Sequence, residues 1–196
     1  MSLVDLSGPD SEIRFDEGFL APREADHIFQ ELLAQIPWRQ ESMNIAGRQI
    51  PFPRLTSWHG DPGTDYTYSG RKFQPEPWIS PLATVKMLVE TLIGYSFNSV
   101  LLNQYRTGAD SVGFHSDDEP ELGPCPLIAS VSLGGDRTFV LRHKARQYDD
   151  IKINLSHGSC LIMSGDTQRC WQHSVPKTKI PVPPRINLTF RRITTN

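Results

Sequence analysis

The strongest constraint on the fold is a series of short strand-like segments in the second half of the chain. The segments are rich in Val, Ile, Leu, Phe and Thr, and they are predicted at about residues 99–106, 127–133, 137–143, 151–155, 159–163, 168–175 and 185–193. Turns are indicated between them at residues 134–136, 157–158 and 165–166. Because no helix separates these strands, the pattern favours a β-sandwich or jelly roll over a parallel α/β sheet.

Two amphipathic segments in the first half of the chain predict helices. Pro22 suits the first turn of a helix, and Gly94 suits the residue that follows a helix end. Apolar side chains recur at helical spacing between these marks, at Ile28, Phe29, Leu32, Leu33 and Ile36, and again at Leu82, Val85, Leu88, Val89 and Leu92. We therefore expect a mostly β fold with flanking helices (α+β), a double-stranded β-helix or jelly roll braced by two helices from the N-terminal half.

The chain of 196 residues has a length that fits one domain, spanning residues 1–196. We expect residues 99–196 to form the jelly-roll core and residues 1–98 to form an N-terminal extension that carries the two helices. Within the extension, residues 1–12 predict a loose or edge-bound arm, and residues 13–20 predict a short strand.

Charge and hydropathy narrow the class of protein. The net charge of −2 argues against coating nucleic acid by bulk electrostatics. No apolar run approaches the ~18 residues that a membrane helix needs, and the first residues lack a basic-then-apolar signal pattern. Cys125, Cys160 and Cys170 are an odd number without C-x-x-C spacing, which predicts reduced thiols. We expect a monomer of the cytoplasm, or of the nucleus in a eukaryote, with no membrane partner.

His115 and Asp117 have the spacing of half a metal site. On extended backbone, two residues at i and i+2 place both side chains on one face, so an imidazole and a carboxylate can reach the same ion. His173, in a strand-like segment further along the chain, is the best third ligand. Two imidazoles and one carboxylate leave three positions open on iron, as in non-haem Fe(II) oxygenases. Taken alone, a His-x-Asp triplet also occurs in proteins without a metal.

The last predicted strand has a polar face that carries two arginines. Its polar residues alternate with apolar ones, so the two kinds of side chain point to opposite faces. The polar residues are Arg185, Asn187, Thr189 and Arg191. Inward-facing arginines are unfavourable unless an anion pairs with them, and a dicarboxylate cosubstrate would satisfy them. The alternative is a buried polar network that only organises the core.

Several ordered motifs together resemble the AlkB family of Fe(II)- and 2-oxoglutarate-dependent dioxygenases. The motifs are Asn103-x-Tyr105, His115-x-Asp117 followed by Asp118-Glu119, His173, and Arg185-x-Asn187-x-Thr189-Phe190-Arg191. The resemblance runs from about Pro53 to the C-terminus. Residues 53–58, 66–70 and 128–134 are similar to the branch of the family that repairs alkylated nucleic acid.

The resemblance implies a role for each of these residues. His115, Asp117 and His173 would hold Fe(II). Arg185 would form a two-pronged pair with the distal carboxylate of 2-oxoglutarate. The other cosubstrate contacts would come from Asn103, Tyr105, Asn187 and Arg191. Two of the open metal positions would take 2-oxoglutarate, and the last would take O2.

The resemblance also implies base-recognition residues, which are Tyr66, Tyr68, Asp118 and Glu119. The tyrosines belong to a lid within residues 1–98, and two rings on one face of a strand suit stacking against a flipped base. The alternative for them is ordinary cross-strand packing. The acidic pair would contact Arg191 or the exocyclic amine of the base, and the alternative is a solvated acidic turn.

A predicted hairpin tip at residues 44–47 bears on whether the enzyme prefers single-stranded or duplex nucleic acid. In the duplex-DNA enzymes of this family, a bulky apolar residue at such a tip can wedge into the base stack. Ala46 is too small for that role, which favours single strands. Phosphate contacts are expected from a local set of basic residues, Arg54, Arg71, Lys72, Arg142, His143, Lys144 and Arg146.

The function that these implications favour is oxidative demethylation of alkylated nucleic acid. The enzyme would remove N-alkyl groups from 1-methyladenine and 3-methylcytosine, with single-stranded DNA favoured, and release succinate, CO2 and formaldehyde. One alternative keeps the chemistry and changes the substrate to RNA, a free nucleotide or a protein side chain. Another is a non-catalytic jelly-roll module that holds a metal, although the arginine face would then have no anion to bind.

Overall fold

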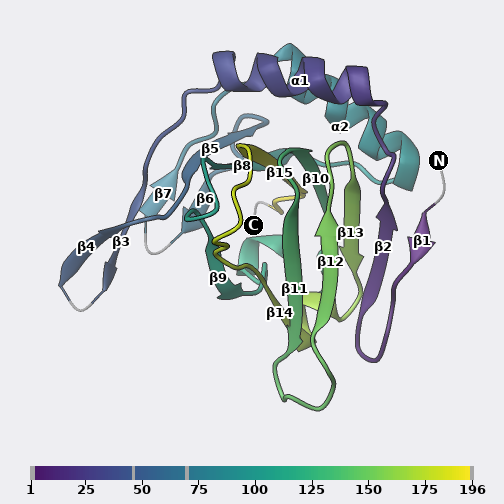
Figure 1. The fold of residues 1–196 in the computed structure, drawn as a ribbon. Coiled ribbons are helices and arrows are strands. Elements are labelled where there is room, and N and C mark those ends of the chain that lie inside the picture. Colours follow the sequence, from purple (N-terminus) through teal and green to yellow (C-terminus); the bar gives the residue numbers. More distant parts are fainter. Residues whose placement is uncertain (1–2, 46, 69–70, 195–196) are drawn as a thin grey trace.

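The fold is a sandwich of a seven-stranded and a four-stranded antiparallel sheet (Figure 1). The computed structural model describes residues 3–45, 47–68 and 71–194. The larger sheet runs in the order β1 (Val4–Asp5), β2 (Glu12–Asp16), β13 (Cys160–Ser164), β10 (Ile128–Gly134), β15 (Arg185–Arg191), β8 (Ser99–Tyr105) and β5 (Leu55–Gly60). The smaller sheet runs in the order β12 (Ile151–Leu155), β11 (Arg137–His143), β14 (Trp171–Val175) and β9 (Val112–His115).

Two helices cover the outer face of the larger sheet. They are α1 (Pro22–Gln35) and α2 (Ser80–Ile93), which lie side by side across one end of the molecule in Figure 1. Proline stands in the first turn of each helix, and α2 ends at Gly94, whose φ of 67° lies in the left-handed region that favours glycine. The prediction of a mostly β jelly roll braced by two helices from the N-terminal half is confirmed.

The sandwich has two hydrophobic layers, one on each side of the larger sheet. Ile186, Leu188 and Phe190 of β15 belong to the layer beneath the helices. The other layer lies between the two sheets and includes Tyr105, Leu141 and other side chains of both sheets. All seven residues of β15 are buried, because β15 is a central strand whose sheet is covered by the helices on one face and by the smaller sheet on the other. Its polar face therefore points into the sandwich.

Strands from the N-terminal half complete the larger sheet at both edges. β2 pairs with β13 at one edge, β1 pairs with β2 outside it, and β5 pairs with β8 at the other edge. The expected edge-bound arm is thus present as β1. Two short hairpins follow α1, formed by β3 (Ser42–Ile45) with β4 (Arg48–Pro51) and by β6 (Tyr66–Tyr68) with β7 (Arg71–Phe73). The β3–β4 hairpin projects away from the sandwich in Figure 1.

Three local predictions differ from the structure. The strand expected over residues 13–20 is limited to β2, because the Gly18 N–H bonds to Asp16 Oδ1 in a turn that follows it. The strand expected over residues 168–175 begins only at Trp171, because Thr167–Cys170 forms the helical turn α3. β9 is a further strand that the predicted strands did not include, and pairing with β14 provides its backbone partners.

Among the described residues, no helix combines the length and apolar character needed to cross a bilayer. The three cysteines are free thiols: Cys125 is exposed, Cys160 is buried and Cys170 is half-buried. The expectation of reduced thiols agrees with this arrangement.

Candidate active site

A cavity opens between the two sheets and collects most of the polar residues singled out by the sequence. Both sheets contribute to its walls, as does the loop that follows β9. The lining includes Arg54, Asn103, Tyr105, His115, Asp117, Glu119, His173, Asn187, Thr189 and Arg191. Trp58 and Phe139 supply apolar wall. Side chains distant in sequence therefore converge on one space.

His115, Asp117 and His173 lie close enough to share one cation. His115 ends β9 and is paired in register with His173 of β14, and the two ring centroids are 4.3 Å apart. Asp117 follows β9, with its Oδ1 atom 3.8 Å from His115 Nε2. One ligand atom from each residue lies within 4.8 Å of the others. His115 Nδ1 lies 2.9 Å from the carbonyl oxygen of Gly113, an arrangement that leaves Nε2 for a metal.

Buried partners fix the charge and position of Asp117. Arg191 Nη2 donates to Asp117 Oδ1 at 2.7 Å, and the Asp117 N–H donates to Gln168 Oε1 at 2.9 Å. Burial raises the pKa of Asp117, but the positive charge of Arg191, the electrostatic interactions with His173 and His115, and the hydrogen bond from Arg191 outweigh it and lower the pKa to about 2. The carboxylate is therefore ionised at neutral pH, as a metal ligand must be.

His173 is a neutral imidazole at neutral pH. Burial, followed by the charge of His115, lowers its pKa to about 3, although Asp117 acts in the opposite direction. Its ring stacks on Phe139, with centroids 5.1 Å apart, which restricts ring rotation. An unprotonated imidazole held in this way is suited to bind a cation.

Arg185 carries a buried charge with unused donors. Its side chain is 1% exposed, and its Nη2 donates to Ser132 Oγ at 2.9 Å. Within the described part of the chain, its Nε and Nη1 have no hydrogen-bond partner. Burial lowers the pKa of Arg185 to about 10, so the group stays protonated at pH 7. Arg185 lies behind Tyr105, with its guanidinium carbon 5.1 Å from the ring centroid, and does not itself line the cavity.

The other proposed cosubstrate residues form a hydrogen-bonded layer on the larger sheet. Asn187 Nδ2 donates to Ser130 Oγ at 2.8 Å and to the carbonyl of Val131 at 3.1 Å. Asn103 Oδ1 accepts from Arg54 Nε at 2.7 Å. These contacts are what a purely organising network would show. The unsatisfied donors of Arg185 go beyond such a network, since a core without a ligand rarely leaves them unpaired.

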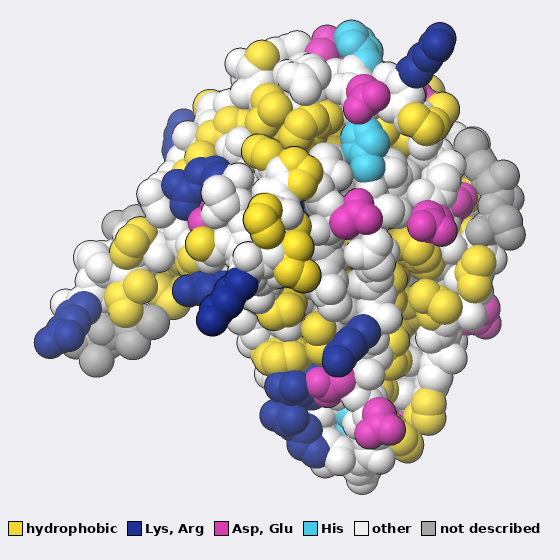
Figure 2. All heavy atoms as spheres, in the orientation of Figure 1, with side chains coloured by type: hydrophobic (Ala, Val, Ile, Leu, Met, Phe, Trp, Pro, Cys, Tyr) yellow, Lys and Arg dark blue, Asp and Glu magenta, His cyan; other side chains and the backbone are white. Residues whose placement is uncertain are grey.

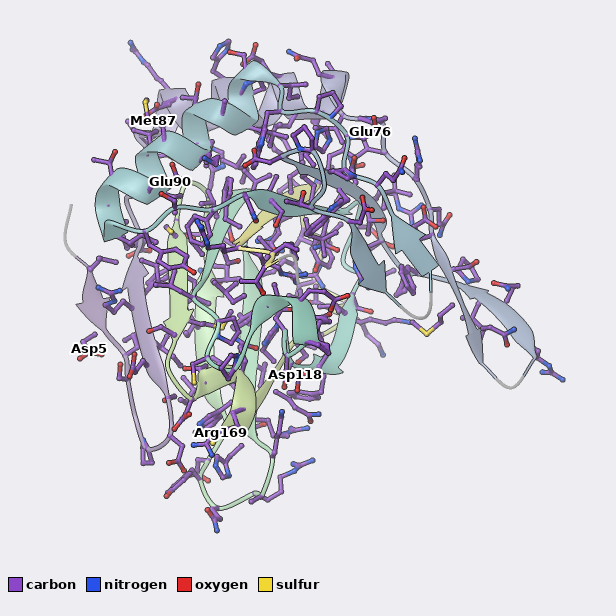
Figure 3. The ribbon with its side chains drawn as sticks, turned by 180° about the vertical axis from the view of Figure 1, so that it is seen from behind. Asp5, Glu76, Met87, Glu90, Asp118 and Arg169 are labelled. Carbon is purple, nitrogen blue, oxygen red and sulfur yellow. The ribbon has the colours of Figure 1, made fainter. Side chains whose placement is uncertain are left out.

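Asp118 and Glu119 occupy different places. Asp118 is an exposed residue whose carboxylate bonds to Lys144 Nζ at 3.1 Å, and it is absent from the cavity lining. Figure 3 places it at the lower end of the molecule near Arg169, away from Met87 and Glu90 of α2. Glu119 lines the cavity. The expected pairing of the acidic turn with Arg191 is wrong for Asp118, because Asp118 is exposed and pairs with Lys144, whereas Arg191 is buried and pairs with Asp117.

Part of the base-recognition prediction falls on residues that the structure does not describe. Tyr66 and Tyr68 lie in β6, but their side chains, like those of Arg71 and Lys72, lie outside the described part. Ala46 also lies outside the described residues, between β3 and β4. For these residues, the predictions rest on the sequence alone.

The expected set of phosphate-contacting residues is only partly exposed. Arg54 is 7% exposed and lines the cavity, and His143 is 5% exposed, so neither can meet a backbone phosphate at the surface as expected. Arg142 pairs with Asp150 at 2.6 Å and lies over the Phe114 ring. Figure 2 shows Lys and Arg side chains over the lower part of one face and at the β3–β4 hairpin.

Sequence reasoning missed the support for Asp117. Gln168 is 1% exposed and lies on α3, within the segment that was expected to be strand. No local pattern marks a glutamine that accepts a backbone N–H from a residue so distant in sequence. The sequence also did not predict the inward position of Arg54, because its partner Asn103 lies in β8, which is distant in sequence.

Comparisons with known proteins identify the family of the chain. The sequence model of the family described as "2OG-Fe(II) oxygenase superfamily" matches residues 12–191. The chain is 44% identical over 185 residues to alpha-ketoglutarate-dependent dioxygenase alkB homolog 3 of Homo sapiens, an alignment that covers 90% of this chain and 64% of that protein. It is 41% identical over 180 residues to DNA oxidative demethylase ALKBH2 of Homo sapiens, which covers 87% and 69% of the two chains.

A solved structure shares the fold. The structure titled "The structure of OsALKBH1" matches with a TM-score of 0.69 and 20% identity, covering 97% of this chain and all of that one. The chain spans 64% of the length of the alkB homolog 3 proteins of mouse, cattle and human. The family name implies Fe(II) and 2-oxoglutarate as metal and cosubstrate. The match to the family model and the identity to these relatives show that the chain belongs to the 2-oxoglutarate- and Fe(II)-dependent oxygenases, within their AlkB family.

Proposed function

We propose that this chain is an Fe(II)- and 2-oxoglutarate-dependent dioxygenase that removes N-alkyl groups from nucleic acid, with 1-methyladenine and 3-methylcytosine in single-stranded DNA as substrates. O2 is the second cosubstrate, and the products are succinate, CO2, formaldehyde and the unmodified base. The observation that carries the proposal is a triad of His115, Asp117 and His173 in a cavity whose wall includes Tyr105, with the buried guanidinium of Arg185 and its unpaired Nε and Nη1 behind that tyrosine.

The triad fits Fe(II) by its chemistry. It offers two neutral imidazoles and one ionised carboxylate, the donor set of the facial triad. Arg191 and Gln168 hold the carboxylate from two sides, so Asp117 needs little reorganisation to bind a cation. When bound, Fe(II) with 2-oxoglutarate and O2 supplies the oxidation of the N-alkyl carbon.

The larger sheet provides the cosubstrate groups. A carboxylate beside Tyr105 would take the two unused donors of Arg185, and the fork geometry of a guanidinium suits such a pair. Asn103 and Arg191 line the same cavity as the triad and can donate to the remainder of the diacid. Asn187 also lines it, and because its Nδ2 already donates to Ser130 and Val131, it orders this wall of the cavity. Exclusion of water by the apolar wall strengthens each of these interactions.

Base recognition is assigned to the mouth of the cavity. We place Glu119 there as the acceptor for an exocyclic amine, because it lines the cavity, while Asp118 faces solvent. Tyr66 and Tyr68 would stack on the base, as the resemblance implies. The name DNA oxidative demethylase borne by a relative supports DNA as the substrate class. RNA remains the second candidate, since alkylated single strands of either kind present the same base.

We further propose that residues 1–98 and 99–196 act as one dioxygenase domain located in the cytoplasm, or in the nucleus of a eukaryote. Pairing of β2 with β13 and of β5 with β8 joins the two parts in one sheet, which supports a single unit. The free thiols support a reducing compartment.

The test is product formation from oligonucleotides that each carry one 1-methyladenine or 3-methylcytosine. Single-stranded DNA, duplex DNA and single-stranded RNA are incubated with Fe(II), 2-oxoglutarate and air, and succinate, formaldehyde and the repaired base are measured. We expect stoichiometric formaldehyde and succinate with single-stranded DNA, and neither product with the His173→Ala variant. If product formed from RNA alone, RNA would take the place of DNA as the proposed substrate. If no oligonucleotide gave product, the proposed activity would be overturned.

A further inference from the structure

A second group of side chains with metal-ligand chemistry lies outside the candidate active site. Asp10, His143 and Cys170 each offer one ligand atom, and these atoms lie within 4.8 Å of one another. In the part of the chain that the structure describes, it is the one such group besides the triad in the cavity. A carboxylate, an imidazole and a thiolate together suit Zn(II) or a similar borderline-soft divalent cation.

Three segments that are distant in sequence bring these residues together. His143 ends β11 and Cys170 ends α3, and the N–H of the residue after His143 donates to the Cys170 carbonyl at 2.8 Å. Asp10 lies in the turn between β1 and β2, which descends beside the lower end of the sandwich in Figure 1. Trp171 Nε1 donates to the carbonyl of Pro9 at 3.1 Å, which docks this turn against β14.

His143 is buried in a way that calls for a partner. It is 5% exposed, and its ring packs edge-on against Trp171 and Tyr148, with centroids 5.2 Å and 5.0 Å away. Neither ring nitrogen has a hydrogen-bond partner among the described residues, although Nε2 lies 3.5 Å from Asp10 Oδ2. An unsatisfied buried polar atom is destabilising, and a cation between the three residues would satisfy it.

The ligand atoms of Asp10, His143 and Cys170 need only small movements to reach the geometry of a metal site. In tetrahedral zinc sites with bonds of ~2.0 to 2.3 Å, neighbouring ligand atoms are about 3.3 to 3.8 Å apart. The 3.5 Å separation between His143 and Asp10 already falls in this range. Asp10 has a side chain 47% exposed and Cys170 is half-buried, so both can rotate toward the fixed imidazole. A water molecule can take the fourth position.

We propose that Asp10, His143 and Cys170 form a structural zinc-type site, separate from the Fe(II) site. The bound cation fastens the β1–β2 turn to α3 and to the paired ends of β11 and β14. α3 also carries Gln168, which accepts the Asp117 N–H, so the second cation braces the segment that positions an iron ligand.

Cobalt(II) provides a test that sees the second site alone. A thiolate bound to Co(II) gives a near-ultraviolet charge-transfer absorption, and the proposed iron ligands include no sulfur. The metal-stripped full chain is titrated with Co(II) while this absorption is recorded. We expect the band to saturate by two Co(II) per chain, one of them bound at the triad without a thiolate band, and to disappear when excess Zn(II) is added. Absence of a thiolate band at saturating Co(II) overturns the proposal.

Three variants and one control assign the band to the named residues. Cys170→Ser removes the thiolate, and His143→Phe keeps an aromatic ring for Trp171 and Tyr148 while removing both nitrogens. Asp10→Asn removes charge at a position whose φ of 55° asparagine also tolerates. We expect loss of the band with Cys170→Ser and at least tenfold weaker Co(II) binding with the other two variants. Cys125→Ser, at an exposed cysteine, should leave the band unchanged.

Zinc stoichiometry by equilibrium dialysis separates this proposal from the proposed function. The wild-type chain should hold two Zn(II), because the facial triad also takes zinc, and Cys170→Ser should hold one. His115→Ala should lose one Zn(II) and keep the cobalt thiolate band. A band that survives Cys170→Ser, or one that vanishes with Cys125→Ser, refutes the assignment even if demethylase activity is found.

Discussion

At the scale of single residues, the most informative side chain is Arg185. A guanidinium that is 1% exposed, with Nε and Nη1 unpaired, is destabilising in the absence of an anion. Among the described residues, its side chain donates one hydrogen bond, from Nη2 to Ser132 Oγ at 2.9 Å. We infer that a bound carboxylate supplies the missing acceptors and so recovers the free energy that an unpaired buried guanidinium costs.

We therefore predict opposite effects of Arg185→Met on stability and on binding. Without cosubstrate, the variant should be as stable as the wild type or up to about 4 kcal/mol more stable, because a buried unpaired charge is replaced by apolar volume. Its affinity for 2-oxoglutarate should fall about 10- to 100-fold, as expected for loss of charged hydrogen bonds worth ~1.5 to 3 kcal/mol.

Urea unfolding and calorimetric titration with 2-oxoglutarate in the presence of Mn(II) measure the two effects. Ser132→Ala, which removes only the hydroxyl partner of Arg185, serves as the matched control and should change affinity much less. Unchanged affinity in Arg185→Met would remove this residue from the cosubstrate site.

At the scale of elements, the sequence predicts regular strands well and their exceptions poorly. β8, β10, β11, β12, β13 and β15 carry apolar periodicity that is visible locally, and their positions are confirmed. β9 has only two apolar residues, Val112 and Phe114, and it becomes a strand through its partner β14. Residues 167–170 turn helical because the Cys170 N–H reaches the carbonyl of Asp166. Such tertiary effects leave no local pattern.

The candidate site also contains some residues that the sequence reveals and others that only the fold reveals. The motif residues His115, Asp117, His173 and Arg185 are visible in sequence because their types and order are distinctive. Gln168 is not visible, because its role depends on α3 lying beside the loop after β9. Glu119 and Asp118 are adjacent in sequence but have different surroundings, and only the fold separates them.

The turn between β10 and β11 is an element on which the position of Arg185 depends. Gly134 has a φ of 86°, and a Cβ atom there would collide with the carbonyl of Pro184 and the ring of Phe29. The Gly135 N–H donates to that same carbonyl at 2.9 Å, directly before β15 begins. The turn, α1 and the start of β15 therefore meet at one tightly packed point.

We predict that Gly134→Ala destabilises the protein by about 1 to 3 kcal/mol, since the left-handed backbone and the collision both oppose a side chain. Gly18→Ala is the matched control, because a Cβ at Gly18 meets no atom within 4 Å; its effect should stay within about 0.5 kcal/mol. Chemical denaturation of both variants measures the difference. Equal denaturation midpoints for Gly134→Ala and Gly18→Ala would contradict the prediction, because they would show that the packing around Gly134 can relax with no loss of stability.

At the scale of the whole molecule, the metal and the cosubstrate should tie the two sheets together. The proposed iron ligands His115 and His173 come from the smaller sheet, and Arg185 comes from the larger one. Ligands that bind only the folded state raise its stability by about 2.7 kcal/mol at a concentration 100 times the dissociation constant.

We predict that Mn(II) and 2-oxoglutarate together raise the melting temperature by about 5 to 10 °C, at ~2 to 4 °C per kcal/mol for a chain of this size. Differential scanning fluorimetry with each ligand alone and with both measures the shift. The His173→Ala variant should show a much smaller shift for the pair. An equal shift in this variant would place the binding elsewhere in the molecule.

The division of the site between two sheets has a consequence for selectivity. Packed sheets lie about 10 Å apart, and that gap is fixed by the side chains that fill the sandwich. In the proposed site, a keto-diacid has to be long enough to reach the triad at one end and the buried guanidinium at the other. We therefore expect a four-carbon analogue to lose one of these two contacts and to bind more weakly than 2-oxoglutarate, so that the thickness of the sandwich selects the length of the cosubstrate.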